Sequence, residues 1–320
     1  MAEQANSQLA RIPELGVGLN YQSHFRPFLE KRSGEFDFLE IVPDIFWIDH
    51  GQGASTRYIE DAVQVDFLHK MRERMPVIMH SIGLSIGSAH RFNREHLAQL
   101  AVWQHRLASR WHSDHLAYHL TDGSLSAAHG LSPGTEINVG VTMPLSRTRA
   151  VLNRVAAHVR EVQQTIDAPF LLENNVYFVE MPDDEMDEAR FLNALCLESG
   201  CGLLLDLHNV HCNSLNMGND ARSLLDELDL SNVVEIHLGG GHEDGPYYLD
   251  SHSGPTPEPV WELLDHVLAR APNVRGIVFE LFGSWYETMG ESGLSAELRR
   301  MRAAWRRRRN VALRAREMCA

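Results

Sequence analysis

The sequence contains few cysteines, no long apolar run and too few basic residues to balance its acidic ones. Its four cysteines form no CxxC pair in 320 residues, which argues against a disulfide framework and fits a reduced, cytoplasmic compartment. No apolar stretch reaches the roughly 18 residues that a membrane span requires, so we expect no membrane association. Lysine and arginine number 29 against 43 aspartates and glutamates, and this balance argues against nucleic-acid binding, which needs a basic surface.

What the chain does contain is a series of short apolar runs that end in polar residues. They lie at 16–20, 36–42, 76–81, 111–117, 170–174, 202–208, 233–238 and 276–281. Nearly continuous apolar runs, as opposed to strict alternation, indicate strands that are buried on both faces, as in a parallel sheet.

Most segments between these runs have the spacing of an amphipathic helix. The segment 58–74 places Ile59, Val63, Phe67 and Met71 four residues apart. Similar patterns occupy 93–110, 149–166, 187–198, 221–228 and 258–270. Eight strand–helix units predict an α/β protein with a single-domain (β/α)8 TIM barrel. An open doubly wound sheet is disfavoured because no GxGxxG motif follows the first run.

The domain organisation follows from this pattern. We expect a disordered tail over 1–12, a catalytic barrel over 13–290 and an Arg-rich C-terminal helix over 291–320. The helix would either present a solvated basic face that balances the acidic body or dock an acidic partner. The segment 118–144 after the fourth strand is too long for an ordinary βα loop, and we expect it to form a partly ordered lid.

Ionisable side chains gather at the predicted carboxyl ends of the strands, which form the active face of a barrel. They are His80, Asp114, His115, Glu173, Asp206, His208, His237 and Glu280, with Asp250 and His252 in the loop after the seventh strand. Asp206 and His208 are two residues apart, so we expect them on one side of a strand. Each residue alone has an ordinary structural explanation, but burying them together without a cation would cost many kcal/mol. We therefore predict a metal site.

The ligand types restrict the metal. Imidazole and carboxylate without thiolate suit Fe, Mn, Zn or Co. The candidates outnumber the four ligands of a mononuclear structural site, which indicates a di- or trinuclear centre.

The motifs around these residues resemble a known family. They are HSIGLSIGSA from His80, SDHLAY from Ser113, LLENNVYFVE from Leu171, CGLLLDLHNVHCNSLNMG from Cys201, VVEIHLGGG from Val233 and LDSHSGP from Leu249. In this order, from about Gly16 to Leu281, they resemble the multinuclear non-haem iron-dependent oxidative enzymes, which include the methanobactin-biosynthesis oxidase. The resemblance implies a TIM barrel with two or three irons in mixed-valent Fe2+/Fe3+ states. It also implies O2-dependent oxidation of a Cys, Asp or Asn in a ribosomally made precursor peptide, often delivered by a partner protein.

The resemblance also implies roles for the residues. The metal ligands would be His80, Glu173, Asp206, His208, His237, Asp250, His252 and Glu280, with Glu173 as a bridge. Asp114 would act as a ligand or general base, and His115 would orient Asp114 or the substrate. The run 239–241 would either let the backbone approach the peptide closely or form a plain turn.

One position departs from the family pattern. Many members carry a histidine in a second-strand motif of the form EVHxEN, whereas this chain has Val42 at that position. Valine cannot bind metal, so a ligand is missing unless His24 or Asp44 replaces it, and a full set of three irons is in question.

A reading from another class of enzyme also fits the ligand set. A hydrolase or sugar-isomerase-like barrel could use two or three divalent ions to activate water or a sugar hydroxyl. Iron content together with O2 consumption separates the two readings. A binding scaffold without activity is disfavoured by the number of ligands.

Overall fold

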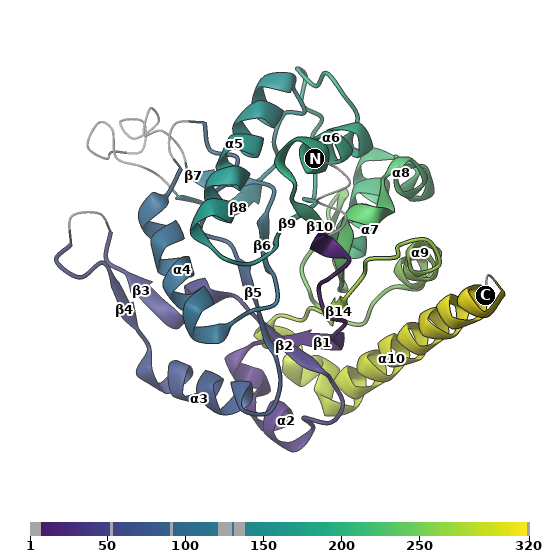
Figure 1. The fold of residues 1–320 in the computed structure, drawn as a ribbon, viewed down its shortest axis with the longest axis horizontal. Coiled ribbons are helices and arrows are strands. Elements are labelled where there is room, and N and C mark those ends of the chain that lie inside the picture. The colour runs from purple at the N-terminus through teal and green to yellow at the C-terminus, as the bar shows by residue number, and fades with distance from the viewer. Residues whose placement is uncertain (1–7, 52–53, 90–91, 121–129, 131–137, 319–320) are drawn as a thin grey trace.

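The central element is a closed barrel of eight parallel strands (Figure 1). The computed structural model describes residues 8–51, 54–89, 92–120, 130 and 138–318. The barrel strands are β1 (Gly16–Asn20), β2 (Phe38–Ile41), β5 (Val77–Ser81), β6 (His112–His115), β9 (Phe170–Glu173), β10 (Gly202–Asp206), β11 (Val233–Leu238) and β14 (Gly276–Phe279). Each strand pairs with the next, and β14 pairs with β1 to close the barrel. The prediction of a TIM barrel is confirmed.

Helices follow the barrel strands and surround them. They are α2 (Arg26–Lys31), α3 (Ala62–Arg72), α4 (Arg94–Leu107), α5 (Arg149–Thr165), α6 (Glu188–Ser199), α7 (Leu207–Met217), α8 (Ala221–Glu227), α9 (Glu258–Leu268) and α10 (Tyr286–Met318). Several of these helices are capped by the side chain of the residue that precedes their first turn. Asp61 accepts hydrogen bonds from the backbone of the first turn of α3, and Asp187 does the same for α6. Such caps satisfy backbone donors that have no partner within the helix.

The helix predicted over 58–74 is wrong at its start. Residues Tyr58–Glu60 form β4, which pairs antiparallel with β3 (Trp47–Asp49). The cap at Asp61 ends this strand and begins the helix. Of the expected apolar stripe, Phe67 and Met71 are buried, whereas Ile59 is 48% exposed and Val63 69% exposed.

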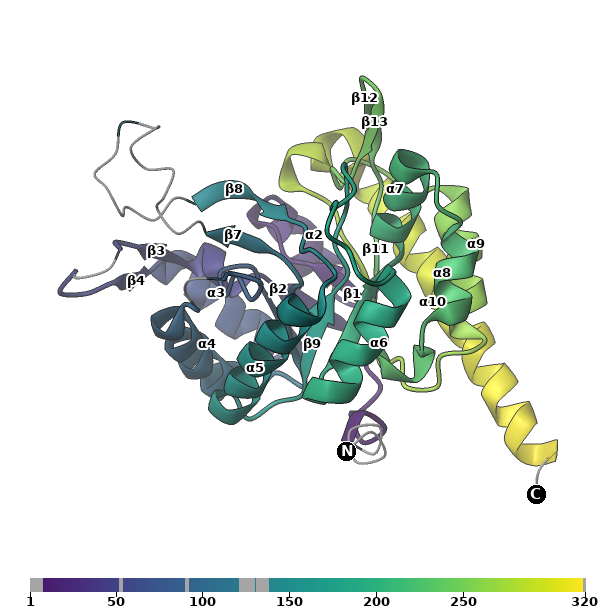
Figure 2. The same cartoon turned by 90° about the horizontal axis from the view of Figure 1, so that it is seen from above.

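Two further hairpins extend from the same end of the barrel, opposite both termini (Figure 2). They consist of β7 (Tyr118–Leu120) with β8 (Asn138–Met143), and β12 (His242–Asp244) with β13 (Tyr247–Leu249). Short 3-10 segments lie at Ser23–Phe25, Pro43–Phe46, Leu230–Asn232 and Gly283–Trp285. The expected lid begins and ends in the β7–β8 hairpin, and its central residues 121–129 and 131–137 lie outside the described residues.

An apolar floor closes the lower part of the barrel interior. It contains Phe38, Ile78, Trp111, Leu171, Leu204, Val234 and Val278, all of which are buried. Leu9 and Ile12 pack against this floor, so residues 8–12 are not the free tail expected there; their apolar side chains cover the end of the barrel. Because water is excluded from this layer, charges placed directly above it interact strongly.

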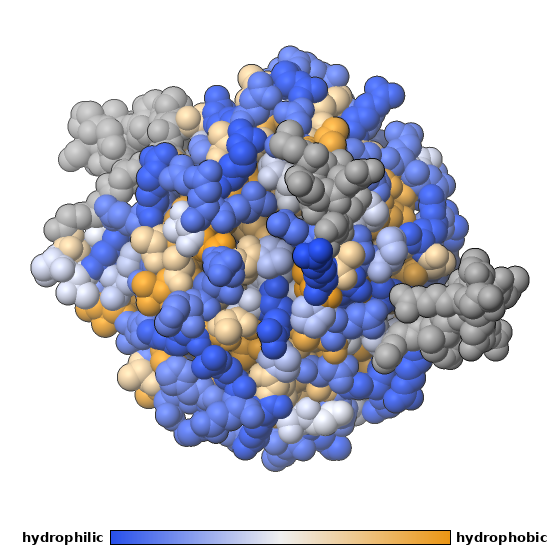
Figure 3. All heavy atoms as spheres, in the orientation of Figure 1, coloured by the Kyte–Doolittle hydropathy of each residue, from blue (hydrophilic) through white to orange (hydrophobic). Residues whose placement is uncertain are grey.

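The final helix packs along the outside of the barrel. Its backbone breaks at Gly290, whose φ of 67° lies in the left-handed region that favours glycine. Leu298, Met301 and Trp305 are buried, while the Arg302 guanidinium donates to Asp37 over 2.9 Å. Figure 3 shows a mainly hydrophilic face with scattered apolar residues. Among the described residues, no helix is both long and apolar enough to cross a membrane.

Candidate multinuclear metal centre

The carboxyl ends of the barrel strands direct histidines and carboxylates into the barrel. Three groups of side chains among the described residues could each hold a metal ion, because their ligand atoms lie within 4.8 Å of one another, and two of these groups share a residue. The first group is His80, His115 and Glu173; the second is Glu173, Asp206, His237 and Glu280. All these residues are buried except His115, which is partly exposed. Both groups contain Glu173.

Glu173 presents one carboxylate oxygen to each group. Its Oε2 lies 2.9 Å from Nδ1 of His115 and 3.2 Å from Nε2 of His80. Its Oε1 lies 3.8 Å from Nδ1 of His237, which is itself 3.0 Å from Oε2 of Glu280. This is the arrangement of a carboxylate that can bridge two ions.

The loop after β13 brings further ligand types to the rim of the cluster. Oδ1 of Asp250 lies 2.8 Å from Nδ1 of His208 and 2.9 Å from Nε2 of His252. Nε2 of His252 lies 3.5 Å from Oε2 of Glu280, which connects this set to the second group. The positive φ of His252, 43°, is strained for a residue with a side chain.

The glycine run 239–241 accommodates this loop. A Cβ at Gly240 would lie 2.5 Å from the carbonyl oxygens of Gly254 and Pro255, and one at Gly241 would meet the carbonyl of Leu249 at 2.1 Å. The run therefore permits close approach of the chain's own ligand-bearing loop, in place of either the peptide contact or the plain turn expected from the sequence.

His208 does not belong to a strand, contrary to expectation. Asp206 ends β10 and caps α7, accepting a hydrogen bond of 2.7 Å from the backbone of Asn209. His208 thus lies in the first turn of the helix, and its position near Asp206 does not come from strand alternation. Asn174 clamps this turn, because its side chain bonds to both the N–H and the carbonyl of Asp206, at 2.8 and 3.0 Å.

The crowded charges shift the pKa values of the cluster in opposite directions. Burial lowers the pKa of His252, but Asp250 and Glu280 outweigh burial and raise it to about 10. Burial likewise lowers the pKa of His115, but the neighbouring Glu173 outweighs burial and raises this pKa to about 9. For Asp206, burial and the neighbouring carboxylates together raise the pKa well above its ordinary value. Protons thus compensate the negative charge in the metal-free protein, and metal binding would displace them.

His115 and Asp114 occupy different faces of β6. His115 points inward and belongs to the first group. It therefore lies where a metal ligand could lie, whereas the sequence suggested that it orients Asp114 or the substrate. Asp114, one residue earlier, points outward, where its Oδ2 accepts a 2.6 Å hydrogen bond from Ser81. Asp114 belongs to neither group. The expected role of Asp114 as a ligand or general base does not fit this position, because neighbouring strand residues face opposite sides.

Two buried carboxylates of the barrel interior were missed. Glu40 on β2 and Glu235 on β11 form a third group with His237, again within 4.8 Å. The residues predicted from the sequence lie at the ends of the apolar runs, whereas Glu40 and Glu235 lie earlier in theirs. The available signal was a glutamate inside an otherwise apolar strand, since a charge is rarely fully buried unless it has a partner.

Neither proposed substitute for the missing second-strand ligand reaches the cluster. Asp44 pairs with Nε2 of His96 at 3.0 Å and accepts a hydrogen bond from the backbone of Ile82. His24 is exposed and lies against Gly283. Both residues fall outside the ligand groups found among the described residues.

The Asp44–His96 pair should make stability depend on pH. Burial opposes both charges, but their attraction outweighs it, lowering the pKa of Asp44 and raising that of His96. The His96 contribution is complete below its unfolded value of 6.5 and is lost as pH rises through the higher folded value. The Asp44 contribution is present above 3.8 and lost as pH falls through the lower folded value.

We therefore expect His96→Gln to cost about 2 kcal/mol of unfolding free energy near pH 5.5, as for a hydrogen bond between charged groups, and less near pH 9. Urea unfolding of the metal-free proteins at both pH values measures the difference. An equal cost at both would show that the pair is not charged.

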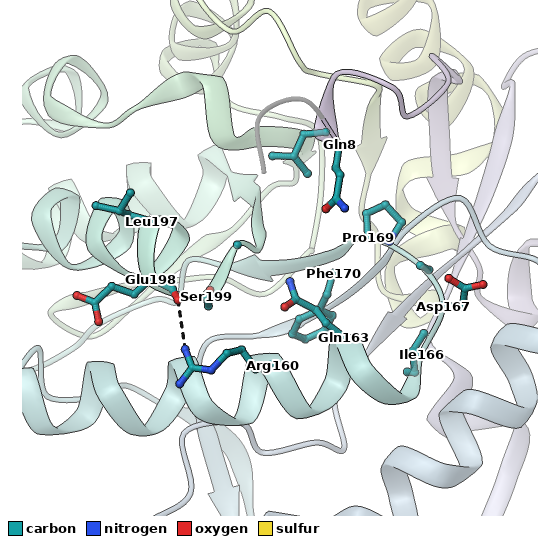
Figure 4. A pocket seen from close by; sticks show the side chains of 13 residues that line it. Gln8, Arg160, Gln163, Ile166, Asp167, Pro169, Phe170, Leu197, Glu198 and Ser199 are labelled. Carbon is teal, nitrogen blue, oxygen red and sulfur yellow. Dashed lines mark hydrogen bonds between the residues drawn. The ribbon is translucent and has the colours of Figure 1, made fainter. Parts of the chain in front are cut away.

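A cavity of about 500 Å³ lies at the other end of the barrel (Figure 4). Its lining includes Gln8, Gln163 and Pro169, which precedes β9. The Arg160 guanidinium donates to the carbonyl of Glu198 over 3.2 Å there. None of the ligand groups found among the described residues lines this cavity, so it is separate from the candidate centre.

The fold and the site together define a TIM-barrel enzyme fold with a candidate multinuclear metal centre at the carboxyl ends of its strands. Residues 14–303 match the family described as RiPP precursor modification enzyme MbnB/TglH/ChrH, and the chain belongs to this family. The resemblance seen in the motifs is thereby confirmed.

The chain is also similar to curated relatives over most of its length and, in its fold, to solved structures. The UPF0276 protein of Rhizorhabdus wittichii is 31% identical over 256 residues, which cover 80% of this chain and 83% of the relative. That of Chromobacterium violaceum is 32% identical over 255 residues, with 80% and 83% covered. Among structures, D-psicose 3-epimerase from Clostridium cellulolyticum has a TM-score of 0.53 at 15% identity, covering 92% of this chain and 99% of the epimerase. Endonuclease IV from Thermus thermophilus gives 0.53 at 15%, covering 92% and 100%. At these identities the likeness concerns the fold alone.

Proposed function

We propose that this protein is an iron-dependent, O2-using oxidase that modifies a Cys, Asp or Asn residue of a ribosomally made precursor peptide. The observation that carries the proposal is Glu173, whose two oxygens face two separate groups of ligands. The membership in a family of precursor-modifying enzymes supports a peptide substrate.

The residues of the cluster fit a pair of metal ions. Oε2 of Glu173, Nδ1 of His237 and Nε2 of His252 are buried and have no hydrogen-bond partner, although other polar atoms lie close by. Cations bound by the two groups would satisfy such atoms without hydrogen bonds. Nitrogen and carboxylate ligands without thiolate suit non-haem iron.

Named residues would hold the ions. His80, His115 and Glu173 would hold one, and Glu173, Asp206, His237 and Glu280 the other. Asp250, His252 and His208 would either complete the shell or orient it, through the hydrogen bond between His208 and Asp250 and the contact of His252 with Asp250. Iron held there would supply redox chemistry for a reaction with O2.

The surroundings of the centre offer a surface for a peptide. Phe282 is 46% exposed, and its ring lies 4.8 Å from that of His252. Tyr247, on the β12–β13 hairpin, is 40% exposed. These side chains would contact apolar parts of a bound peptide, while the ligands of the barrel stay beneath it. A cytoplasmic location and a partner protein that delivers the peptide complete the proposal.

The proposal is tested with protein purified without oxygen from iron-supplemented cells. We expect more than one iron per chain and O2 consumption when the precursor peptide encoded beside the gene is added. At most one metal per chain after careful reconstitution would contradict it. A colourless zinc or manganese protein that is active without O2 would instead favour the hydrolase or isomerase reading.

A further inference from the structure

The His237 imidazole lies between carboxylates on both of its nitrogen atoms. Nδ1 is 3.0 Å from Oε2 of Glu280 and faces the candidate metal pair. Nε2, on the opposite side of the ring, donates to Oε2 of Glu40 over 3.1 Å. His237 is fully buried and Glu40 is 1% exposed, so water competes for neither atom.

We propose that Glu40 is a positioning residue that holds His237 with Nδ1 directed at the metal ions. The inference rests on the proposed metal centre. A neutral imidazole carries one N–H, and the group that accepts it determines which nitrogen is free to bind metal. An accepting carboxylate fixes the ring orientation and makes the other nitrogen a stronger donor, as in other carboxylate–histidine–metal arrangements.

The position of Glu40 suits a residue that orients His237 and does not itself bind the ions. Glu40 belongs to neither group that contains Glu173, although it lies within reach of His237. Its strand places it one layer above Phe38 of the apolar floor, two residues earlier on β2. A buried pair of charged groups is expensive to keep, and replacing both partners by well-packed apolar side chains often leaves stability unchanged or higher. Structural stability alone therefore does not explain a glutamate here.

The competing interpretation is a metal ion held by Glu40, Glu235 and His237 themselves. Their ligand atoms lie close enough for this. However, Oε2 of Glu235 already accepts a 2.6 Å hydrogen bond from the indole N–H of Trp111, which leaves only its Oε1 for an ion. An ion there would also require His237 to bind through Nε2 and to turn its N–H toward Glu280. The hydrogen bond to Glu40 leaves Nδ1 on the side where the other ligands gather.

The experiment compares Glu40→Leu and Glu40→Gln with wild type, using Glu235→Gln as the matched control on the neighbouring carboxylate. Each protein is loaded with Fe2+ without oxygen, and the release of iron to a chelator is followed. Leucine cannot accept the His237 N–H, and we expect release about 10–100-fold faster, as for loss of other outer-shell partners. Glutamine retains an accepting oxygen and should recover most of the difference. Glu235→Gln should release iron at nearly the wild-type rate.

Melting of the metal-free proteins separates positioning from a structural role. Glu40→Leu leaves the buried His237 N–H without an acceptor, so we expect the metal-free variant to melt lower than wild type, whereas Glu40→Gln, which keeps an accepting oxygen, should melt near wild type. A lower melting temperature with unchanged release would show a structural role and overturn the proposal, as would a wild-type release rate in Glu40→Leu. Loss of one metal equivalent in both Glu40→Gln and Glu235→Gln would place an ion between them and also overturn it.

These outcomes are independent of the oxidase activity, because no substrate or O2 is present. A wild-type protein that holds two irons but never consumes O2 contradicts the proposed function and leaves the positioning result valid. A wild-type protein that holds no iron contradicts both.

Discussion

Replacing Glu173 by glutamine is expected to release more than one metal ion per chain and to abolish O2-dependent turnover. Glu173 is the member shared by both candidate groups, with one oxygen facing His115 and the other facing His237. An uncharged amide is a poor ligand for Fe2+ and a poorer bridge. Because loss of an outer-shell partner already costs 10–100-fold in affinity, we expect a loss of about 100-fold or more for this change.

The fold should survive the substitution. Burial alone raises the pKa of Glu173, but His115 and His80 outweigh burial and hold it well below its ordinary value, so the carboxylate is charged. Glutamine gives up the attraction to His115 and His80, which costs some stability in the metal-free state, but it keeps the shape of the side chain and an oxygen that accepts a hydrogen bond. The apolar floor beneath it is unaffected.

Asp114→Asn is the matched control for Glu173→Gln. Both residues are buried carboxylates near the ends of neighbouring strands, but Asp114 faces outward to Ser81. We expect metal analysis and O2 uptake of Asp114→Asn to match wild type. Equal metal loss in the two variants would mean that any change of a buried carboxylate in this region disturbs metal binding. Normal metal content in Glu173→Gln would show that Glu173 does not bridge the ions.

The architecture could be predicted from the sequence because its signal is repeated. Each of the eight apolar runs corresponds to a barrel strand, and a parallel sheet buried on both faces leaves few other arrangements. Boundaries were less accurate where a polar residue changes the element. Asp61 begins a helix where the apolar spacing suggested one already under way. Asp206 likewise ends a strand and caps a helix.

The site could be predicted only in part, because composition does not reveal which way a side chain faces. When both faces of a strand are buried, alternation no longer distinguishes inside from outside. Asp114 and His115 are adjacent ionisable residues of β6, yet only His115 points into the barrel. Glu40 and Glu235 were missed for a related reason: Glu40 lies on β2, which β1 and β14 separate from the β11 strand of Glu235 and His237, so the three residues meet only when the barrel closes.

Restoring a histidine at position 42 is expected to tighten metal binding. Val42 continues the extended backbone of β2, with φ −90° and ψ 104°, so its side chain shares the inward face with Glu40. That places position 42 one layer nearer the open end of the barrel than Glu40. Neither Asp44 nor His24 occupies the space, since Asp44 pairs with His96 and His24 is exposed.

The Val42→His variant should therefore release iron about tenfold more slowly than wild type under mild chelation, because imidazole adds a donor without adding charge. Asp44→Ala and His24→Ala should release it at the wild-type rate. Metal analysis along a chelator titration of all four proteins distinguishes the alternatives. Faster release from Val42→His, together with loss of one ion from Asp44→Ala or His24→Ala, would mean that the position is already filled. Four identical curves would mean that no ion lies near the second strand, in which case the centre is confined to the two groups joined by Glu173.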